Sequence, residues 1–113
     1  MMTSCKPAPG DIWLAYVEYK DHPGVGKVRP VIIVDVLDST FTALAAKVTS
    51  KDLSITGTGI VVPIIDWQHC GLRKPSYVRL DQKLILERDR LKRDEPIGRV
   101  SDVLLQLIAS ALR

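Results

Sequence analysis

The pattern of apolar and polar residues changes period once, close to the C-terminus of the chain. Between residues 11 and 86, apolar residues occur in short runs rich in Val, Ile and aromatic side chains, which are typical of β-strands. After residue 101 the apolar positions recur at steps of three and four, the spacing of one face of an α-helix. The pattern therefore predicts a mainly β fold with a C-terminal helix.

Strands are predicted at residues 11–20, 31–37, 40–50 and 59–65, with one or two short strands at 76–82 and 84–86. Only Asp35 interrupts the apolar run at 31–37, which is typical of a central strand covered on both faces. The strand at 40–50 is expected to pair with it. Residues 21–27 contain two glycines and a proline, so we expect a mobile loop there. Residues 51–58 are predicted to form a second, polar loop.

Helical segments are expected at 66–71, as a single turn, and at 88–94. The terminal helix begins after Ser101, a favourable N-cap residue. Its expected buried face comprises Val103, Leu104, Leu107, Ile108, Ala111 and Leu112. Several closely spaced strands and one terminal helix suggest an α+β fold, namely a small, partly open β-barrel closed by the C-terminal helix. We expect a single domain at residues 10–113, preceded by a flexible leader at residues 1–9.

Composition narrows the class of protein. The 113 residues are 46% hydrophobic and 26% charged, as in ordinary soluble domains. The longest apolar runs are far shorter than the roughly 20 residues that a membrane helix needs, and no secretory signal is recognisable. Cys5 and Cys70 are too few for a disulfide scaffold and lack zinc-type spacing. We therefore expect a cytoplasmic protein with no metal, no cofactor and no membrane partner.

The net charge of +3 is small but unevenly distributed. Residues 1–56 hold six basic and six acidic side chains, whereas residues 71–93 hold eight basic and three acidic ones. A local excess of positive charge indicates an anion-binding surface. The basic run at 88–93 is interrupted by Asp89, so we interpret that part as a solvated helix face.

The segment 77–82 contains the most informative combination of residues. Strand alternation directs Val78 and Leu80 to the core, and Tyr77, Arg79 and Asp81 to the opposite face. A cation and a carboxylate on one face can support phosphodiester transfer on RNA, because one group takes the 2′-hydroxyl proton and the other stabilises the phosphate. An exposed ion pair on a solvated strand is the alternative from the pattern alone.

Other candidate residues lie near the ends of predicted strands. Arg29 precedes the strand at 31–37, where its guanidinium can hold a phosphate bidentately or remain a rim residue. Thr49 and Ser50 can donate hydroxyls to phosphate or cap the following loop. His22 can act as an acid or base, although a lone loop histidine is more often inert. These alternatives stay open from the residues alone.

Five short segments occur in a characteristic order: Gly10-Asp11-Ile12-Trp13-Leu14, Arg29-Pro30-Val31-Ile32-Ile33-Val34, Val48-Thr49-Ser50, Val78-Arg79-Leu80-Asp81-Gln82 and Ile97-Gly98-Arg99-Val100-Ser101. Together they resemble the MazF/PemK (Kid) family of toxin ribonucleases from bacterial toxin–antitoxin pairs, and the PemK/Kid branch more closely. Residues 51–75 depart from the better-known members, so the sequence at which RNA is cut does not carry over.

This resemblance implies an SH3-like barrel, usually a homodimer, that cuts single-stranded RNA without a metal and leaves a 2′,3′-cyclic phosphate and a 5′-hydroxyl. It makes Asp81 the base, Arg79 the acid or phosphate stabiliser, and Arg29 a second electropositive group. The expected catalytic residues are thus Arg29, Thr49, Arg79 and Asp81, and the expected RNA-binding residues are His22, Lys27, Ser50 and Gln82. A cognate antitoxin is the expected protein partner, and the complex of the two is expected to bind DNA.

Two other functions remain as alternatives. The same barrel can serve as an RNA- or partner-binding module without catalysis. It is also shared by gyrase poisons of the CcdB type, whose activity lies in a C-terminal Trp-Gly-Ile sequence. Residues 110–113 of this chain read Ser-Ala-Leu-Arg, which disfavours the gyrase-poison interpretation.

Overall fold

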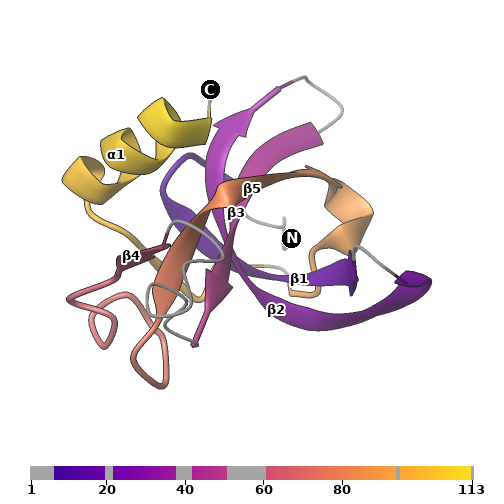
Figure 1. Ribbon diagram of the computed structural model, residues 1–113, viewed down its shortest axis with the longest axis horizontal. Helices are drawn as coiled ribbons and strands as arrows, with labels where there is room; N and C mark the ends of the chain where they lie inside the picture. Colours follow the sequence, from indigo (N-terminus) through magenta and orange to yellow (C-terminus); the bar gives the residue numbers. More distant parts are fainter. Residues whose placement is uncertain (1–6, 20–21, 38–41, 51–60, 94, 113) are drawn as a thin grey trace, which may run out of the picture.

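The computed structural model describes residues 7–19, 22–37, 42–50, 61–93 and 95–112. A six-stranded antiparallel sheet has the order β4-β5-β3-β2-β1-β6. The elements are β1 (Asp11–Tyr19), β2 (His22–Val36), β3 (Thr42–Thr49), β4 (Val61–Pro63), β5 (Tyr77–Glu87), the 3₁₀ helix η1 (Arg88–Arg90), β6 (Gly98–Arg99) and the helix α1 (Asp102–Leu112). The sheet curls into a half-barrel, and α1 lies against one side of it (Figure 1). The predicted fold class is confirmed.

The segment after β5 closes part of the barrel. Figure 1 shows η1 leading from the end of β5 towards β1. Ala15 and Leu91 form an antiparallel bridge, and the Lys92 N–H donates a hydrogen bond of 2.9 Å to the Leu14 carbonyl. The Ile97 N–H donates in the same way to the Ile12 carbonyl, at 2.8 Å. These bonds pair the outer edge of β1, which would otherwise expose backbone groups.

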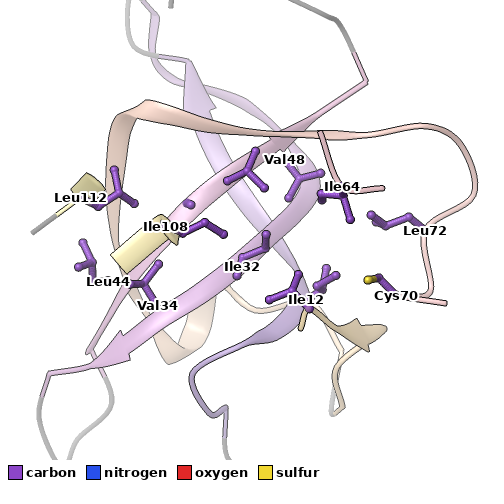
Figure 2. Packing of buried hydrophobic residues seen from close by; sticks show 13 residues of the cluster. Ile12, Ile32, Val34, Leu44, Val48, Ile64, Cys70, Leu72, Ile108 and Leu112 are labelled. Carbon is purple, nitrogen blue, oxygen red and sulfur yellow. The ribbon is translucent and has the colours of Figure 1, made fainter. Parts of the chain in front are cut away.

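Two apolar clusters fill the two faces of the sheet. Cluster 1 lies under α1 and contains Ile12, Ile32, Val34, Leu44, Ala46, Val48, Ile64, Cys70, Leu72, Val78, Val100, Ile108 and Leu112. Cluster 2 contains Trp13, Ala15, Val17, Val31, Ile33, Ala43, Ala45, Leu86 and Leu91. Figure 2 shows cluster 1 extending from Ile108 and Leu112, near Leu44 and Val34, to Cys70 and Leu72.

The run at residues 31–34 contributes to both clusters, as we predicted for a central strand. Ile32 and Val34 belong to cluster 1, whereas Val31 and Ile33 belong to cluster 2. β2 pairs with β1 on one side and with β3 on the other, so the pairing expected for the strand at 40–50 is also confirmed.

Residues 77–82 and 84–86 belong to one long strand, β5, instead of one or two short ones, and Ser76 lies just before it. The register of β5 against β3 changes along the strand. Val78 pairs with Val48 and Lys83 pairs with Ala46, so five residues of β5 correspond to two residues of β3 between these pairs. The three additional residues are an odd number, so the alternation reverses along the strand. Val78 and Leu80 pack in cluster 1, while Leu84 and Leu86 pack in cluster 2. The core positions predicted for residues 78 and 80 are confirmed.

The loop predicted at residues 21–27 is wrong over its described part, because β2 begins at His22. β2 remains paired with β1 as far as Gly26 and pairs again at His22, after a register shift that leaves residues 23–25 as a bulge. Gly26 permits this pairing, since a Cβ there would lie 2.2 Å from the Val17 carbonyl oxygen. The glycines therefore form a bulged hairpin instead of ending the strand.

The terminal helix matches the prediction at its start but only partly along its buried face. The Leu104 N–H donates to the Ser101 hydroxyl at 3.2 Å, which confirms the N-cap. Ile108 and Leu112 are buried, whereas Val103 and Leu107 are 80% and 48% exposed. The apolar face of α1 is wider than the area of sheet that the helix covers. Ile108 and Leu112, four residues apart, pack on the sheet, whereas Val103 and Leu107 remain on the surface.

The remaining elements are short. The turn expected at 66–71 is present, since the Asp66 carbonyl accepts hydrogen bonds from the N–H groups of His69 and Cys70. The helix expected at 88–94 is limited to η1, and the two-residue β6 had no strand signal of its own. β4 is shorter than the strand predicted at 59–65, of which residues 59–60 lie outside the described residues, as does the whole of the predicted loop at 51–58.

Part of the expected N-terminal leader packs against the sheet. Pro7 is buried, and the Ala8 N–H donates to Asp11 Oδ2 at 2.9 Å. The other oxygen of this carboxylate accepts a hydrogen bond of 3.1 Å from Arg99 Nη1. Asp11 therefore ties the chain before β1 to β6. Residues 1–6 of the expected leader lie outside the described part of the chain.

Candidate functional site

The strand register brings basic residues that are distant in sequence to one face of the sheet. Trp13 of cluster 2 is opposite Val31, and Val31 is opposite Lys47 on β3. Directly opposed residues of antiparallel strands direct their side chains to the same face. Lys47 therefore lies on the face of cluster 2. Arg29 also lies there, because it is opposite Ala15 of the same cluster.

The same face continues across β3 and β5. Thr49 is two residues beyond Lys47 and is opposite Tyr77, and Arg79 follows Tyr77 by two residues. Residues two apart in a strand share a face. On the other side, Lys27 is opposite Val17 of cluster 2. We call this set the cationic face, defined by Lys27, Arg29, Lys47, Thr49 and Arg79.

Neighbouring positions on this face lie within reach of one ligand. Val31 of β2 is opposite Lys47 of β3, which fixes the register of these two strands. The next positions on the same face are Arg29 of β2 and Thr49 of β3, so these two residues are neighbours. Opposed Cβ atoms lie about 5 Å apart, and positions two residues apart on a strand lie about 6.6–6.8 Å apart. The site thus places guanidinium, ammonium and hydroxyl groups at neighbouring positions of one face, and these are groups that bind phosphate.

The environment of the cationic face is partly apolar. Arg29, Lys47, Thr49 and Arg79 are half-buried, and Lys27 is exposed. The Nε atom of Arg29 is buried and finds no hydrogen-bond partner among the residues that the structure describes. A buried N–H without a partner costs about 1–3 kcal/mol, and an anion bound there would recover part of that cost.

Two expected site residues cannot be placed as side chains. Asp81 and Gln82 are part of β5, within the stretch where its register against β3 changes, and their side chains lie outside the described residues. The prediction that Arg79 and Asp81 share a face therefore stays a prediction. Because the alternation reverses between Leu80 and Leu84, simple spacing does not determine the orientation of Asp81.

The other expected RNA-binding residues differ in position. Ser50 is exposed and directly follows Thr49, so it adjoins the cationic face. His22 is opposite Tyr19, four residues along β1 from Ala15, which corresponds to about 13 Å along the strand. The structure does not bring His22 to the group formed by Arg29, Thr49 and Arg79.

Lys47 is a residue of the cationic face that was not predicted from the sequence. It is a single lysine within the otherwise apolar segment of β3, and its neighbours Ala46 and Val48 are both buried in cluster 1. Alternation then requires Lys47 to point to the opposite face. The signal was present in the sequence, but only the register shows that Arg29 and Arg79 lie on that same face.

The basic run at 88–93 is only partly the solvated face that we expected. The Arg88 guanidinium lies over the Trp13 ring at 5.5 Å, and Arg90 lies over Tyr16 at 5.6 Å. Arg90 also forms an ion pair of 3.4 Å with Glu18. These contacts attach η1 to β1 and contribute to barrel closure.

Cys70 has no feature of a reactive cysteine. Its side chain is buried in cluster 1, and its thiol donates a hydrogen bond of 3.6 Å to Asp66 Oδ1. Burial, together with the negative charge of Asp66, raises the pKa of the Cys70 thiol to about 11. The nucleophilic thiolate is therefore disfavoured at neutral pH.

The fold and the site together define a small, half-open β-barrel protein with several basic side chains on one face of its sheet. Over residues 8–113, the chain matches the family described as the PemK-like, MazF-like toxin of type II toxin-antitoxin system. The chain belongs to this family, which confirms the resemblance found in the sequence. The match includes the PemK-like and MazF-like branches together, so the closer similarity to PemK stays a prediction. A comparison with curated proteins found no significant match.

Membership of this family makes the chain a toxin of a type II toxin–antitoxin pair, which implies a cognate antitoxin as its partner. Within the described ranges, no helix is long and apolar enough to cross a membrane. Over the same residues, no group of three or more His, Cys, Asp or Glu side chains is arranged to hold a metal ion.

Proposed function

We propose that this toxin is an endoribonuclease that cleaves single-stranded RNA, principally messenger RNA in the cytoplasm, without a metal ion. The observation that carries the proposal is that Arg29, Thr49 and Arg79 lie on one face of the sheet. The Nε–H group of Arg29 is buried there and has no hydrogen-bond partner among the described residues. Such a face suits the phosphate of an RNA strand. The family resemblance supplies the reaction.

In the proposed reaction, the 2′-hydroxyl attacks the adjacent phosphate. The 2′-oxygen–phosphorus bond forms, the phosphorus–5′-oxygen bond breaks, and the products carry a 2′,3′-cyclic phosphate and a 5′-hydroxyl. Asp81 accepts the proton of the 2′-hydroxyl, and the departing 5′-oxygen takes a proton from solvent. Arg29 and Arg79 stabilise the charge on the phosphate oxygens, and the Thr49 hydroxyl donates a further hydrogen bond.

Digestion of a long single-stranded RNA by the purified toxin, followed by mapping of the new 5′ ends, tests the proposal. We expect cleavage at preferred sites, 5′-hydroxyl ends, and the same rate in EDTA. Replacing the 2′-hydroxyl at a mapped site by hydrogen should abolish cleavage there. A strict metal requirement or 5′-phosphate ends would contradict the mechanism, and RNA binding without cleavage would identify a binding module.

The base assignment has its own test. General acid–base assistance contributes about 10²–10⁴ in rate, so Asp81→Ala should lose at least that factor. Retention of the wild-type cleavage rate by folded Asp81→Ala would exclude Asp81 as the base.

We also propose that the toxin is a homodimer whose interface includes an apolar groove beside α1. The groove has a volume of about 500 Å³ and is lined by residues of β4, the segment after it and α1. Three large apolar side chains there are solvent-exposed: Ile65 (89%), Val103 (80%) and Leu107 (48%). Exposed apolar patches of this kind mark interaction surfaces, and a second copy agrees with the homodimer that the family resemblance implies.

The cognate antitoxin is proposed to cover the cationic face with an acidic segment. Complementary charge would direct this association and would block access of RNA. Co-expression with the cognate antitoxin is expected to abolish RNA cleavage. An antitoxin that leaves cleavage unchanged would contradict this arrangement.

A further inference from the structure

Lys47 is the residue of the cationic face that the expected site did not include. It is opposite Val31 of β2, so its side chain lies on the face that carries Arg29. Two residues further along β3 is Thr49, and the neighbouring strand β5 contributes Arg79 to the same face. Lys47 therefore occupies the middle of the group.

The surroundings of Lys47 favour an interaction with an anion. Its side chain is half-buried, and the adjacent side chains on its own face include the buried Val31 and Ala45. Charge interactions are stronger near such apolar surroundings than in open solvent. Arg29 and Arg79 lie on the same face as Lys47, and a phosphate backbone interacts favourably with such a set of cations.

We propose that Lys47 binds a backbone phosphate of the RNA substrate, so that the toxin engages RNA through an ammonium group between its two arginines. This inference rests on the proposed ribonuclease function and adds a substrate-binding residue to it. An ammonium acts as a point charge with three rotatable donors, whereas a guanidinium is a planar fork. Lys47 therefore contributes mainly to RNA affinity, independently of base sequence.

Lys83 provides a matched control. It is opposite Ala46, the immediate neighbour of Lys47 on β3, but Ala46 belongs to cluster 1. Lys83 is exposed and lies on the other face of the sheet. Removing either lysine changes the net charge equally. A difference in RNA affinity between the two variants therefore reports on the position of the lysine and not on net charge.

The experiment measures binding of a fluorescein-labelled, 2′-O-methyl single strand of mixed sequence, which lacks the attacking hydroxyl. Wild type, Lys47→Ala, Lys47→Met, Lys47→Arg and Lys83→Ala are titrated between 50 and 200 mM salt, and cleavage of unmodified RNA is measured in parallel. We expect Lys47→Ala and Lys47→Met to lose about fivefold or more in affinity, with a salt slope lower by about 0.7. Lys47→Arg should retain most of the affinity, and Lys83→Ala should match the wild type.

The outcomes separate this inference from the function on which it rests. If the wild type binds and cleaves RNA while Lys47→Ala or Lys47→Met binds equally well, the assignment of Lys47 is overturned and the ribonuclease proposal stands. Equal losses in Lys47→Ala and Lys83→Ala would show an effect of net charge alone and would also overturn it. Binding by the wild type without cleavage would remove the ribonuclease proposal and retain Lys47 as a binding residue. A wild type that neither binds nor cleaves RNA overturns both. Lys47→Met keeps the apolar stem, so it provides the result if Lys47→Ala fails to fold.

Discussion

Arg29 of β2 is directly opposite Ala15 of β1, on the face of the sheet that packs against cluster 2. The guanidinium Nε is buried without a hydrogen-bond partner in the described part of the chain. Stability alone does not account for an arginine at this position, because the buried N–H is a cost to the folded state.

Arg29→Ala is therefore expected to reduce RNA cleavage by about 10² or more, with little loss of stability. Single-turnover cleavage and thermal denaturation measure the two effects. Arg29→Lys should recover only part of the activity, because an ammonium does not reproduce the bidentate contact.

Arg93→Ala is the control for loss of one positive charge, since Arg93 is exposed and lies outside the cationic face. Cleavage by Arg29→Ala at the rate of Arg93→Ala would rule out a direct role for Arg29. An unfolded Arg29→Ala would show that its side chain is structural.

The close approach of β6 to the turn at Cys70 requires a glycine at position 98. A Cβ on Gly98 would lie 1.6 Å from the Cys70 carbonyl oxygen. Gly98→Ala should therefore destabilise the fold by about 2 kcal/mol or more, measured by denaturant unfolding. Gly24 has a φ of +85° but nothing within 4 Å of its would-be Cβ, so Gly24→Ala should cost only about 1 kcal/mol. Equal losses in the two variants would disprove a steric requirement at Gly98.

The strands and the terminal helix were predictable because they depend on local patterns. The apolar run at 31–34 and the three- and four-residue steps after Ser101 each report directly on which side chains are buried. The β1–β2 hairpin was not predicted, because its bulge depends on a backbone geometry that glycine permits. From composition alone, a segment with two glycines and a proline indicates a loop.

The candidate site was only partly predictable, for a related reason. Single-strand alternation assigned Val78 and Leu80 correctly to the core. It could not reveal that the alternation reverses further along β5, nor that Lys47 lies on the face of Arg29, because both depend on pairing between strands. Register between distant segments is set by the packed sheet as a whole.

The thiol of Cys70 is expected to resist alkylation in the folded protein. Its side chain is 1% exposed, and burial together with Asp66 raises its pKa to about 11. In a Cys5→Ser background, iodoacetamide at pH 8 should modify Cys70 slowly in buffer and rapidly in denaturant, as measured by mass spectrometry. Rapid modification of the folded protein would contradict the buried, protonated thiol.

The same pKa predicts a dependence of stability on pH. An unfolded chain releases the thiol proton near pH 9.0, and the folded protein releases it near pH 11. The folded state therefore binds more protons in this range, so the contribution of Cys70 is complete below pH 9 and is lost as pH rises to about 11. Cys70→Ala should lack this component, which denaturant unfolding at pH 8 and pH 10.5 can measure.

The N-cap of α1 makes a testable contribution to stability. The Ser101 hydroxyl accepts the Leu104 N–H, which has no other partner in the first turn of a helix. Ser101→Ala should cost about 1 kcal/mol in the free energy of unfolding. Ser110→Ala, an exposed substitution near the other end of α1, should change it by less than about 0.5 kcal/mol. A neutral Ser101→Ala would show that the cap is not needed once α1 packs on the sheet.

The groove beside α1 predicts how the oligomeric state responds to charge. Val103 is 80% exposed and lines the groove, so Val103→Arg should leave the folded protomer intact while placing a charge in the proposed interface. Val25→Arg is the matched control, because Val25 is 55% exposed and lies on the hairpin formed by β2. Light scattering during size-exclusion chromatography should show the wild type and Val25→Arg at twice the 12.6 kDa protomer mass, and Val103→Arg at the protomer mass. A monomeric wild type would exclude the homodimer, and a dimeric Val103→Arg would place its interface elsewhere.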